Sequence, residues 1–258
     1  MRKRANKKFS LEFHSSYLLV VFGLALTGNY LLIIVITSLI LVHELGHFFM
    51  ARVFGIRSSK IIIYPFGGIT KINSLVNLDI FVELLIASAG VISQFIYYLF
   101  LSFLYHKSLL REYTMDLYTL YNSRMIFFNL MPIYPLDGGR ILYLIICYFF
   151  PYKISNNIII IFSFIFIGIL LFFHIYYYSY VNIIFYFVLV YYLIKFYDKR
   201  NYLYNLFLLE RYLYSISFSK VKRVNNFRFM YKNRSHIIFN GKEYVKENTF
   251  LKNLFCKK

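Results

Sequence analysis

The chain has 258 residues, of which 60% are hydrophobic and 16% charged, and its mean hydropathy is +0.59. Soluble globular proteins hold roughly 45–50% apolar and about 25% charged residues, so a disordered chain is excluded and an ordinary soluble enzyme is disfavoured. The 29 Lys and Arg against 11 Asp and Glu give a net charge of +18, which fits contact with anionic lipid headgroups. The composition therefore predicts an integral membrane protein.

Six apolar segments are predicted to cross the membrane as helices. The first is short for a span, and the fourth is interrupted by Pro132, Pro135 and the pair Gly138-Gly139. A broken helix is tolerated at membrane depth only where protein or a water-filled cavity satisfies the freed backbone groups. In chain order the six segments are residues 17–27, 30–54, 80–105, 125–149, 158–176 and 181–197.

Two further segments have the pattern of paired strands. Lys60–Ile72 is rich in β-branched residues and contains Pro-Phe-Gly-Gly, which predicts a strand, a turn and a second strand. Ser235–Val245 contains Asn240-Gly241, the strongest short hairpin signal. The fold class expected is an all-α integral membrane protein of about six transmembrane helices, with a small hairpin-like β segment at the membrane edge and a small α+β cytoplasmic tail. Residues 1–197 would form the membrane domain and residues 198–258 the tail.

The basic residues predict the orientation, because Lys and Arg gather on the cytoplasmic side of a membrane protein. With six spans, both termini and the segment between the second and third spans lie on one side. That side holds most of the basic residues near the predicted span ends, namely Arg2, Lys3, Arg4, Lys7, Lys8, Arg52, Arg57, Lys60, Lys71, Lys153, Lys195, Lys199 and Arg200. Both termini are therefore expected in the cytoplasm.

The segment His43-Glu44-Leu45-Gly46-His47 lies inside the second predicted span. Residues four apart share one face of a helix, so both imidazoles can bind one Zn²⁺, and Glu44 beside them can act on a water that the metal binds. Three ionisable groups within five residues of a span cost about 2.5–3.5 kcal/mol each on insertion scales, which argues against a purely structural role. The alternative is a pair of core histidines beside a salt-bridged glutamate.

A catalytic zinc site needs a third protein ligand. The two cysteines form no zinc motif, and of the four aspartates only Asp137 lies inside a predicted span. Asp137 is 13 residues from Arg124 and His43 is 13 residues from Tyr30, at the outer ends of their spans, so both lie roughly 20 Å deep at about 1.5 Å per residue. Taken alone, the sequence Leu-Asp-Gly-Gly around Asp137 is equally typical of a turn.

With these motifs the chain resembles the site-2 protease family of intramembrane zinc metalloproteases, in particular its sporulation members. The resemblance covers about 100 residues and rests on four segments in the family's order, His43–His47, Tyr64–Gly68, Ala89-Gly90 and Asn129–Gly139. It implies one Zn²⁺ per chain with His43, His47 and Asp137 as ligands, Glu44 as the catalytic base and a site that faces the cytoplasm.

The chain departs from the family pattern after Ala89-Gly90. Many relatives have Pro next and Asn three residues later, where this chain has Val91 and Gln94. The role of Gln94 is therefore open, and simple packing is one alternative.

The resemblance implies a membrane-associated protein as substrate, and a pro-sigma factor is the candidate. Asn129 would help to position it, although a hydrogen bond between helices is the alternative. An extended substrate could add a strand to the edge of the 60–72 strand pair, which could instead be a mere connector. The residues expected to bind substrate are Asn129, Pro132, Pro135, Phe66, Gly67 and Gly68.

The sequence also suggests further partners and one alternative function. Inhibitory membrane proteins and the lipid bilayer are candidate partners, in a bacterial cell membrane or the membrane around a forespore. Residues 198–258 hold fourteen Lys and Arg against four Asp and Glu but no nucleic-acid motif, so substrate or membrane contact is expected and direct nucleic-acid binding is not. A non-enzymatic metal-binding transporter or carrier is the alternative, but Glu44 beside the histidines favours hydrolysis.

Overall fold

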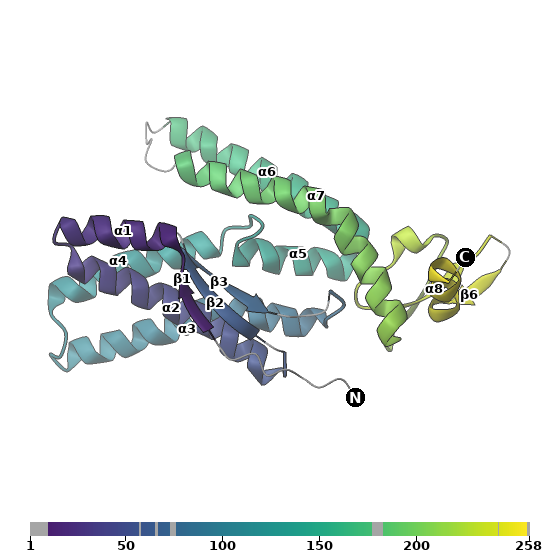
Figure 1. The fold of residues 1–258 in the computed structure, drawn as a ribbon, viewed down its shortest axis with the longest axis horizontal. Helices are drawn as coiled ribbons and strands as arrows, with labels where there is room; N and C mark the ends of the chain where they lie inside the picture. The colour runs from purple at the N-terminus through teal and green to yellow at the C-terminus, as the bar shows by residue number, and fades with distance from the viewer. Residues whose placement is uncertain are drawn as a thin grey trace. The chain divides into compact units, whose positions relative to one another are not determined.

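The computed structural model describes residues 10–56, 58–64, 67–72, 76–176, 183–241 and 243–256. Most of this chain is helical, with two small sheets (Figure 1). The chain divides into two compact units. The first holds Met1–Ser74 and Leu85–Leu130, and the second holds Leu75–Leu84 and Met131–Lys258.

The first unit combines helices with a three-stranded sheet. Strand β2 pairs in parallel with β1 and antiparallel with β3, and helix α2 packs on β2 and β3. The strand pair predicted at residues 60–72 is thus confirmed. The elements are β1 (Ser10–Phe13), α1 (Ser15–Leu26), α2 (Tyr30–Val53), β2 (Ser58–Tyr64), β3 (Gly67–Ile72), most of α3 (Ile80–His106) and α4 (Glu112–Asn129).

The connection from α1 to α2 is a tight turn at Gly28-Asn29, a pair of residues typical of turns. Gly28 has a φ of +74°, which glycine adopts without steric cost. Tyr17 on α1 then hydrogen-bonds through its hydroxyl to Thr37 on α2. The same tyrosine joins a buried apolar cluster with Ile40 and Phe48 of α2 and with strand β2, so this helix pair and the sheet share one core.

The break expected in the predicted fourth span, residues 125–149, is confirmed at the two prolines, whereas Gly138-Gly139 lie inside the helix that follows. Helix α4 ends at Asn129, and α5 (Asp137–Phe149) begins after a connection that contains Pro132 and Pro135. Proline cannot continue a helical hydrogen-bond ladder, so the expected break becomes a full interruption.

Helix α4 begins at Glu112, before the predicted span, in a stretch that contains the charged residues Glu112, Asp116 and Arg124. Met115, Tyr118 and Asn122 are buried along one face of α4. The guanidinium of Arg124 lies 5.9 Å from the centre of the Tyr121 ring. Packing of one face therefore stabilises this helix despite its polar residues, because tertiary contacts outweigh average hydropathy.

The second unit contains α5, two long helices and a small mixed domain. Helices α6 and α7 run side by side (Figure 1). Strand β5 pairs in parallel with β4 and antiparallel with β6, which confirms the hairpin closed by Asn240-Gly241. The elements are α6 (Tyr152–Tyr176), α7 (Ile183–Tyr214), β4 (Val221–Val224), the 3-10 helix η1 (Phe227–Phe229), β5 (Ser235–Phe239), β6 (Tyr244–Lys246) and α8 (Glu247–Phe255).

Helix α7 is continuous from Ile183 to Tyr214 and passes through position 198, where the sequence predicts a domain boundary. The place of that boundary stays a prediction. Helix α8 begins at Glu247, directly after β6.

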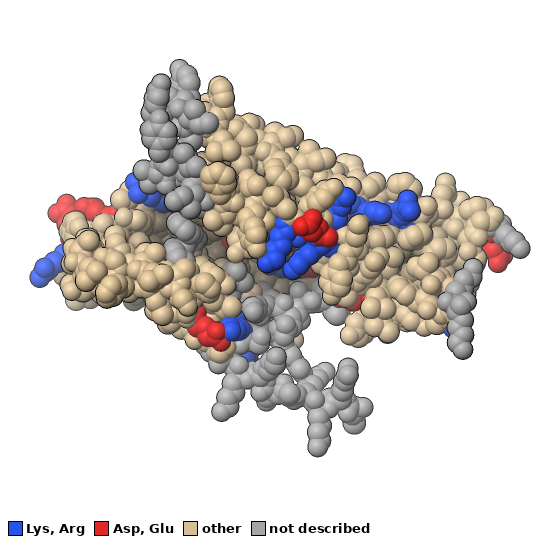
Figure 2. All heavy atoms as spheres, turned by 45° about the horizontal axis from the view of Figure 1, so that its top comes forward, with Lys and Arg blue, Asp and Glu red and all other residues tan. Residues whose placement is uncertain are grey.

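Within the described residues, three helices are long and apolar enough to cross a membrane: Tyr30–Val53, Ile80–His106 and Tyr152–Phe173. Helix α1 is apolar but shorter. The first 18 residues of α7, counted from Ile183, already include four charged residues, which shortens its apolar stretch. These residues are Lys195, Asp198, Lys199 and Arg200. Large apolar side chains are exposed on the three long helices, as lipid contact requires, and charged side chains gather in a few places on the face in Figure 2. The count of six spans stays a prediction.

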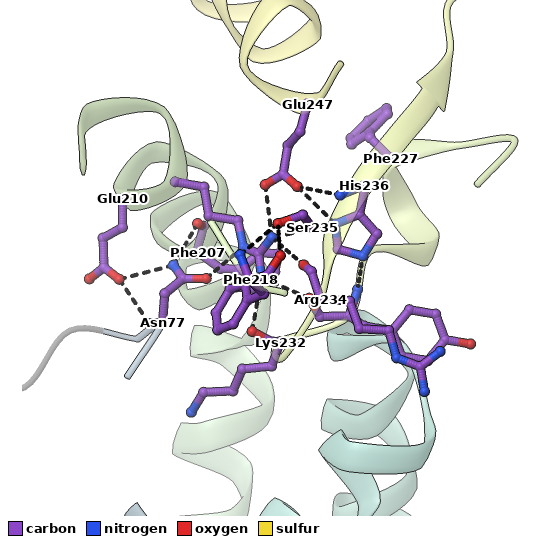
Figure 3. Close-up of polar contacts among 12 residues, drawn as sticks. Asn77, Phe207, Glu210, Phe218, Phe227, Lys232, Arg234, Ser235, His236 and Glu247 are labelled. Atoms are coloured by element: carbon purple, nitrogen blue, oxygen red, sulfur yellow. Dashed lines mark hydrogen bonds and ion pairs between the residues drawn. The ribbon is translucent and has the colours of Figure 1, made fainter. Parts of the chain in front are cut away.

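A buried arginine holds the C-terminal part of the second unit together. Arg211 near the end of α7 has no exposed surface. Its guanidinium donates to Oδ1 of Asn77 at 2.8 Å, to Oε1 of Glu247 at 2.8 Å and to the backbone carbonyl groups of Tyr231, Lys232 and Arg234. Figure 3 shows the surrounding residues of this network, with Glu210 and Asn77 on one side and Glu247 and His236 on the other.

The same network reaches the segment that leads into α3. The carboxylate of Glu210 accepts hydrogen bonds at 3.0 Å from the backbone N–H groups of Val76 and Asn77. Lys232 forms a buried ion pair with Glu83 in the first turn of α3, at 2.5 Å. The start of α3 is therefore anchored on residues of the tail, which makes the tail more than an appended docking segment.

The pKa values of two titratable groups in the network are both lowered. Burial lowers the pKa of His236 below its ordinary value, although Glu247 acts in the opposite sense. Burial alone would raise the pKa of Glu247, but hydrogen bonding from His236 and the charge of Arg211 outweigh it, so this pKa lies below its ordinary value. The lowered pKa of His236 makes the folded state less favourable as the pH falls below about 6.5, because the buried imidazole resists protonation. The lowered pKa of Glu247 stabilises the folded state above the ordinary value of 4.5, and this contribution is lost as the pH falls through the lowered pKa.

Arg211→Gln should lower the free energy of unfolding by about 3–5 kcal/mol, because it leaves the buried Glu247 carboxylate without its partner. Arg223→Gln, which removes an exposed arginine on β4, is the matched control and should change it little. Thermal unfolding of the purified protein in detergent measures both. Equal midpoints for the two variants would show that the network does not stabilise the fold.

Candidate metal and catalytic site

Helix α2 places the two histidines of the His-Glu-Leu-Gly-His segment on one buried face. His43, Glu44 and His47 are 3%, 4% and 8% exposed. The Nε2 atoms of His43 and His47 lie 3.1 Å apart, and the ring planes are nearly perpendicular at 84°. The spacing of four residues thus brings both imidazoles to one point, as the sequence predicts.

Hydrogen-bond acceptors on α3 fix the rotation of both rings. Nδ1 of His47 lies 2.7 Å from the backbone carbonyl oxygen of Ile86, and Nδ1 of His43 lies 2.9 Å from Oε1 of Gln94. Carbonyl oxygens only accept, so each Nδ1 carries the proton and donates it, and each Nε2 presents a lone pair. This tautomer is the one in which a histidine binds metal through Nε2, with its outer nitrogen held by an acceptor.

Small residues let α3 approach the histidines this closely. A Cβ on Gly90 would lie 2.4 Å from Nε2 of His47 and 2.6 Å from Cε1 of His43. A Cβ on Gly46 would lie 2.5 Å from the backbone oxygen of Ala89. Glycine at both positions is therefore required by the contact between α2 and α3, in the way that small residues bring membrane helices together.

Strand β3 covers Glu44 from another direction. Oγ1 of Thr70 donates to Oε2 of Glu44 at 2.7 Å, and a Cβ on Gly68 would lie 2.3 Å from Cγ of Glu44. Gly68 and Thr70 are two apart on a strand and so share one face. The glycine leaves room for the carboxylate, and the threonine fixes its orientation.

The remaining predicted residues lie in different parts of the chain. Asn129 is the half-buried last residue of α4 in the first unit. Asp137 is the half-buried first residue of α5 in the second unit, preceded by Pro132 and Pro135. Contact of Asp137 with the histidine pair, which belongs to the first unit, stays a prediction.

Two of the other predicted substrate residues, Gly67 and Gly68, lie at the start of β3. Gly67 is the first residue of β3, with a φ of +141°, and Gly68 follows it. Phe66 lies outside the described residues.

Two further residues, Gln94 and Thr70, contact the side chains of the predicted site. Gln94 is fully buried, accepts from His43 and donates through Nε2 to Oδ1 of Asn122 at 3.5 Å. The departure from the expected family pattern at this position was the available signal. Thr70 gave no signal beyond its spacing from Gly68.

Comparison with known families gives this site a context. Residues 31–112 match the model of Peptidase family M50. This part of the chain is a peptidase family M50 domain. It includes His43, Glu44, His47 and Gln94, together with the strands that cover Glu44, and it ends before Asp137.

Similar proteins agree with this assignment. Stage IV sporulation protein FB of Bacillus subtilis is 31% identical over 143 residues, covering 55% of this chain and 49% of that protein. A zinc metalloprotease of Methanocaldococcus jannaschii is 32% identical over 160 residues, covering 57% of this chain and 46% of that protein. The chain thus spans about half the length of the curated relatives it matches.

A solved structure shows the same fold. The site-2 protease from Methanocaldococcus jannaschii superposes with a TM-score of 0.54 at 27% sequence identity, covering 69% of this chain and 86% of that one. The M50 domain here therefore has a site-2-protease-like fold.

Gln94→Leu should weaken zinc binding about ten- to hundredfold, because it removes the acceptor that orients His43 while keeping similar bulk. Gln94→Glu retains an acceptor and should bind zinc as tightly as the wild-type protein. Competition with a chelator of known affinity measures both variants. Equal affinities for Leu and Glu at this position would mean that Gln94 only packs.

Proposed function

We propose that this chain is an intramembrane zinc metalloprotease that hydrolyses a peptide bond of a membrane-associated protein at or near the cytoplasmic side. The observation that carries the proposal is the pair of Nε2 lone pairs from His43 and His47, 3.1 Å apart on a buried face beside Glu44. Membership of this region in Peptidase family M50 and the zinc metalloprotease among the relatives support it.

The histidines fit one Zn²⁺ per chain. Tetrahedral zinc with Zn–N distances of about 2.0–2.1 Å has its ligand nitrogens about 3.3 Å apart, close to the spacing found here. Asp137 is proposed as the third protein ligand, since a carboxylate with two histidines is a common catalytic set. Zinc in such a site lowers the pKa of a bound water to about 7 and polarises the scissile carbonyl group.

Glu44 is proposed as the general base. Thr70 engages Oε2, and Oε1 faces the backbone at Gly68, where an added Cβ would lie 2.8 Å from it. The carboxylate is thus held in one orientation beside the histidines, where it can take a proton from the attacking water and later deliver it to the leaving amine. Its burial excludes bulk water from the carboxylate.

Strand β3 is proposed to bind the substrate as an added strand. In the described sheet, β2 is paired on both sides, whereas β1 and β3 each have an outer edge. Strand β3 contacts Glu44 through Gly68 and Thr70. A substrate segment unwound from its helix and paired with β3 would present its peptide bonds beside the base, with affinity from main-chain hydrogen bonds.

The other assignments extend this proposal. Phe66 and Gly67 would flank the added strand, Asn129 would bind a substrate carbonyl group, and Pro132 and Pro135 would line the approach of water or substrate. The substrate is a membrane-associated protein, and a pro-sigma factor is the first candidate because one relative is a sporulation protein. Inhibitory membrane proteins are further candidate partners.

The proposed topology is multi-pass with six spans and both termini in the cytoplasm. The apolar helices α2, α3 and α6 support membrane insertion, and the Lys and Arg distribution supports the orientation. The membrane domain would comprise residues 1–197, and residues 198–258 would form a basic cytoplasmic domain.

Glu44→Gln should reduce cleavage of a co-expressed membrane-bound substrate at least about a hundredfold while zinc content stays unchanged, because the amide keeps the shape but cannot take a proton. Glu112→Gln, at an exposed position in the first turn of α4, is the control and should cleave normally. Turnover of Glu44→Gln at a tenth of the wild-type rate would rule out its role as base. Zinc binding without cleavage of any membrane substrate by the wild-type chain would favour a metal carrier.

A further inference from the structure

A polar pocket lies between the N-terminal end of α6 and the middle of α7, apart from the residues of the proposed protease site. Its volume is about 140 Å³, and it is lined by Lys153, Asn156, Asn157, Arg200 and Asn201. Lys153, Asn156 and Asn157 are spaced i, i+3 and i+4, so they project from one face of α6. The lining thus combines two cations and three amides and contains no carboxylate.

Asn156 gives the pocket a buried donor. Its side chain is 1% exposed, and its Oδ1 accepts from the hydroxyl of Tyr143 at 2.7 Å. Within the described part of the chain its Nδ2 has no hydrogen-bond partner. A buried N–H group without an acceptor is unfavourable, so a ligand oxygen at this point would satisfy it.

The two cations are held in place beside this donor. The guanidinium of Arg200 lies 3.8 Å from the centre of the Tyr197 ring and donates to Oδ1 of Asn157 at 3.2 Å. Nζ of Lys153 lies 5.4 Å from the centre of the Tyr204 ring. Asn157 takes one of the five N–H donors of the arginine, and the fork geometry of that group matches phosphate oxygens.

The position of the pocket strengthens the case for an anion. Helix α6 begins at Tyr152, one residue before Lys153, and the N-terminal end of a helix carries partial positive charge. The described residues Tyr152–Phe173 are one of the helices able to cross a membrane, so its first turn would lie at the level of lipid headgroups.

We infer that this pocket binds a phosphate group, held by Arg200, Lys153 and the Nδ2 of Asn156. The group can come from an anionic phospholipid headgroup or from free phosphate, since both present the same oxygens. Bound phosphate would join α6 to α7, because the two cations belong to different helices.

The test uses the purified full-length chain and two probes. In detergent, inorganic phosphate is titrated against chloride at matched ionic strength, and thermal unfolding is followed. In vesicles, phosphatidylcholine alone is compared with a mixture that contains phosphatidylglycerol, and retained lipid is counted by native mass spectrometry. Stabilisation by inorganic phosphate assigns free phosphate as the source, and selective retention of phosphatidylglycerol assigns the headgroup.

Matched variants distinguish binding at the pocket from a response to the net positive charge of the chain. Arg200→Gln should weaken the response to the active probe about ten- to hundredfold, as expected for loss of a charge-assisted hydrogen bond. Lys199→Gln removes the same charge from the neighbouring exposed position and should respond as the wild-type protein does. Lys153→Gln tests the other helix and keeps the test valid if Arg200→Gln fails to fold.

Two results would overturn the inference. The first is no response of the wild-type protein to either probe. The second is an equal response of Lys199→Gln and the two pocket variants, since that would reflect screening of net charge alone.

Discussion

Two histidines one turn apart on a helix can bind one metal ion only if something fixes the rotation of both rings, and here the neighbouring helix does so. The carbonyl oxygen of Ile86 and the side chain of Gln94 accept from the two Nδ1 atoms and direct both Nε2 atoms to one point. That contact requires α3 to approach α2 within the distance that only glycine permits at Gly46 and Gly90. The chemistry of the site therefore depends on helix packing as much as on the ligands.

The same requirement gives the C-terminal part of the chain a structural role. Helix α3 carries Gln94, and the segment that leads into it is fixed by Glu210 and Arg211, while Lys232 pairs with Glu83 in its first turn. A basic tail would be expected to dock a substrate or an acidic membrane surface through exposed charge. Several of its charges are instead buried in pairs, so removal of residues after 200 should destabilise the start of α3 as well as any docking.

The sequence predicts those elements of the fold that are specified by a few neighbouring residues. The α1–α2 turn follows from Gly28-Asn29, the tail hairpin from Asn240-Gly241, and the histidine pair from helical periodicity. Strands β1 and β4 were not predicted, since each pairs in parallel with the next strand across a longer connection, and no turn signals that pairing. A buried arginine such as Arg211 cannot be told from surface charge by composition, and the hydrogen bond of Thr70 to Glu44 arises only from tertiary packing.

Zinc X-ray absorption on the purified chain tests whether His43, His47 and Asp137 bind one zinc ion together. We expect one zinc per chain bound by two imidazoles and a carboxylate, and loss of most of that zinc in Asp137→Asn. Asp79→Asn is the matched control, because Asp79 accepts from the backbone N–H groups of Phe81 and Val82 at the start of α3 and an asparagine oxygen can do the same. An unchanged spectrum and zinc content in Asp137→Asn would show that Asp137 is not a ligand and place the third ligand elsewhere.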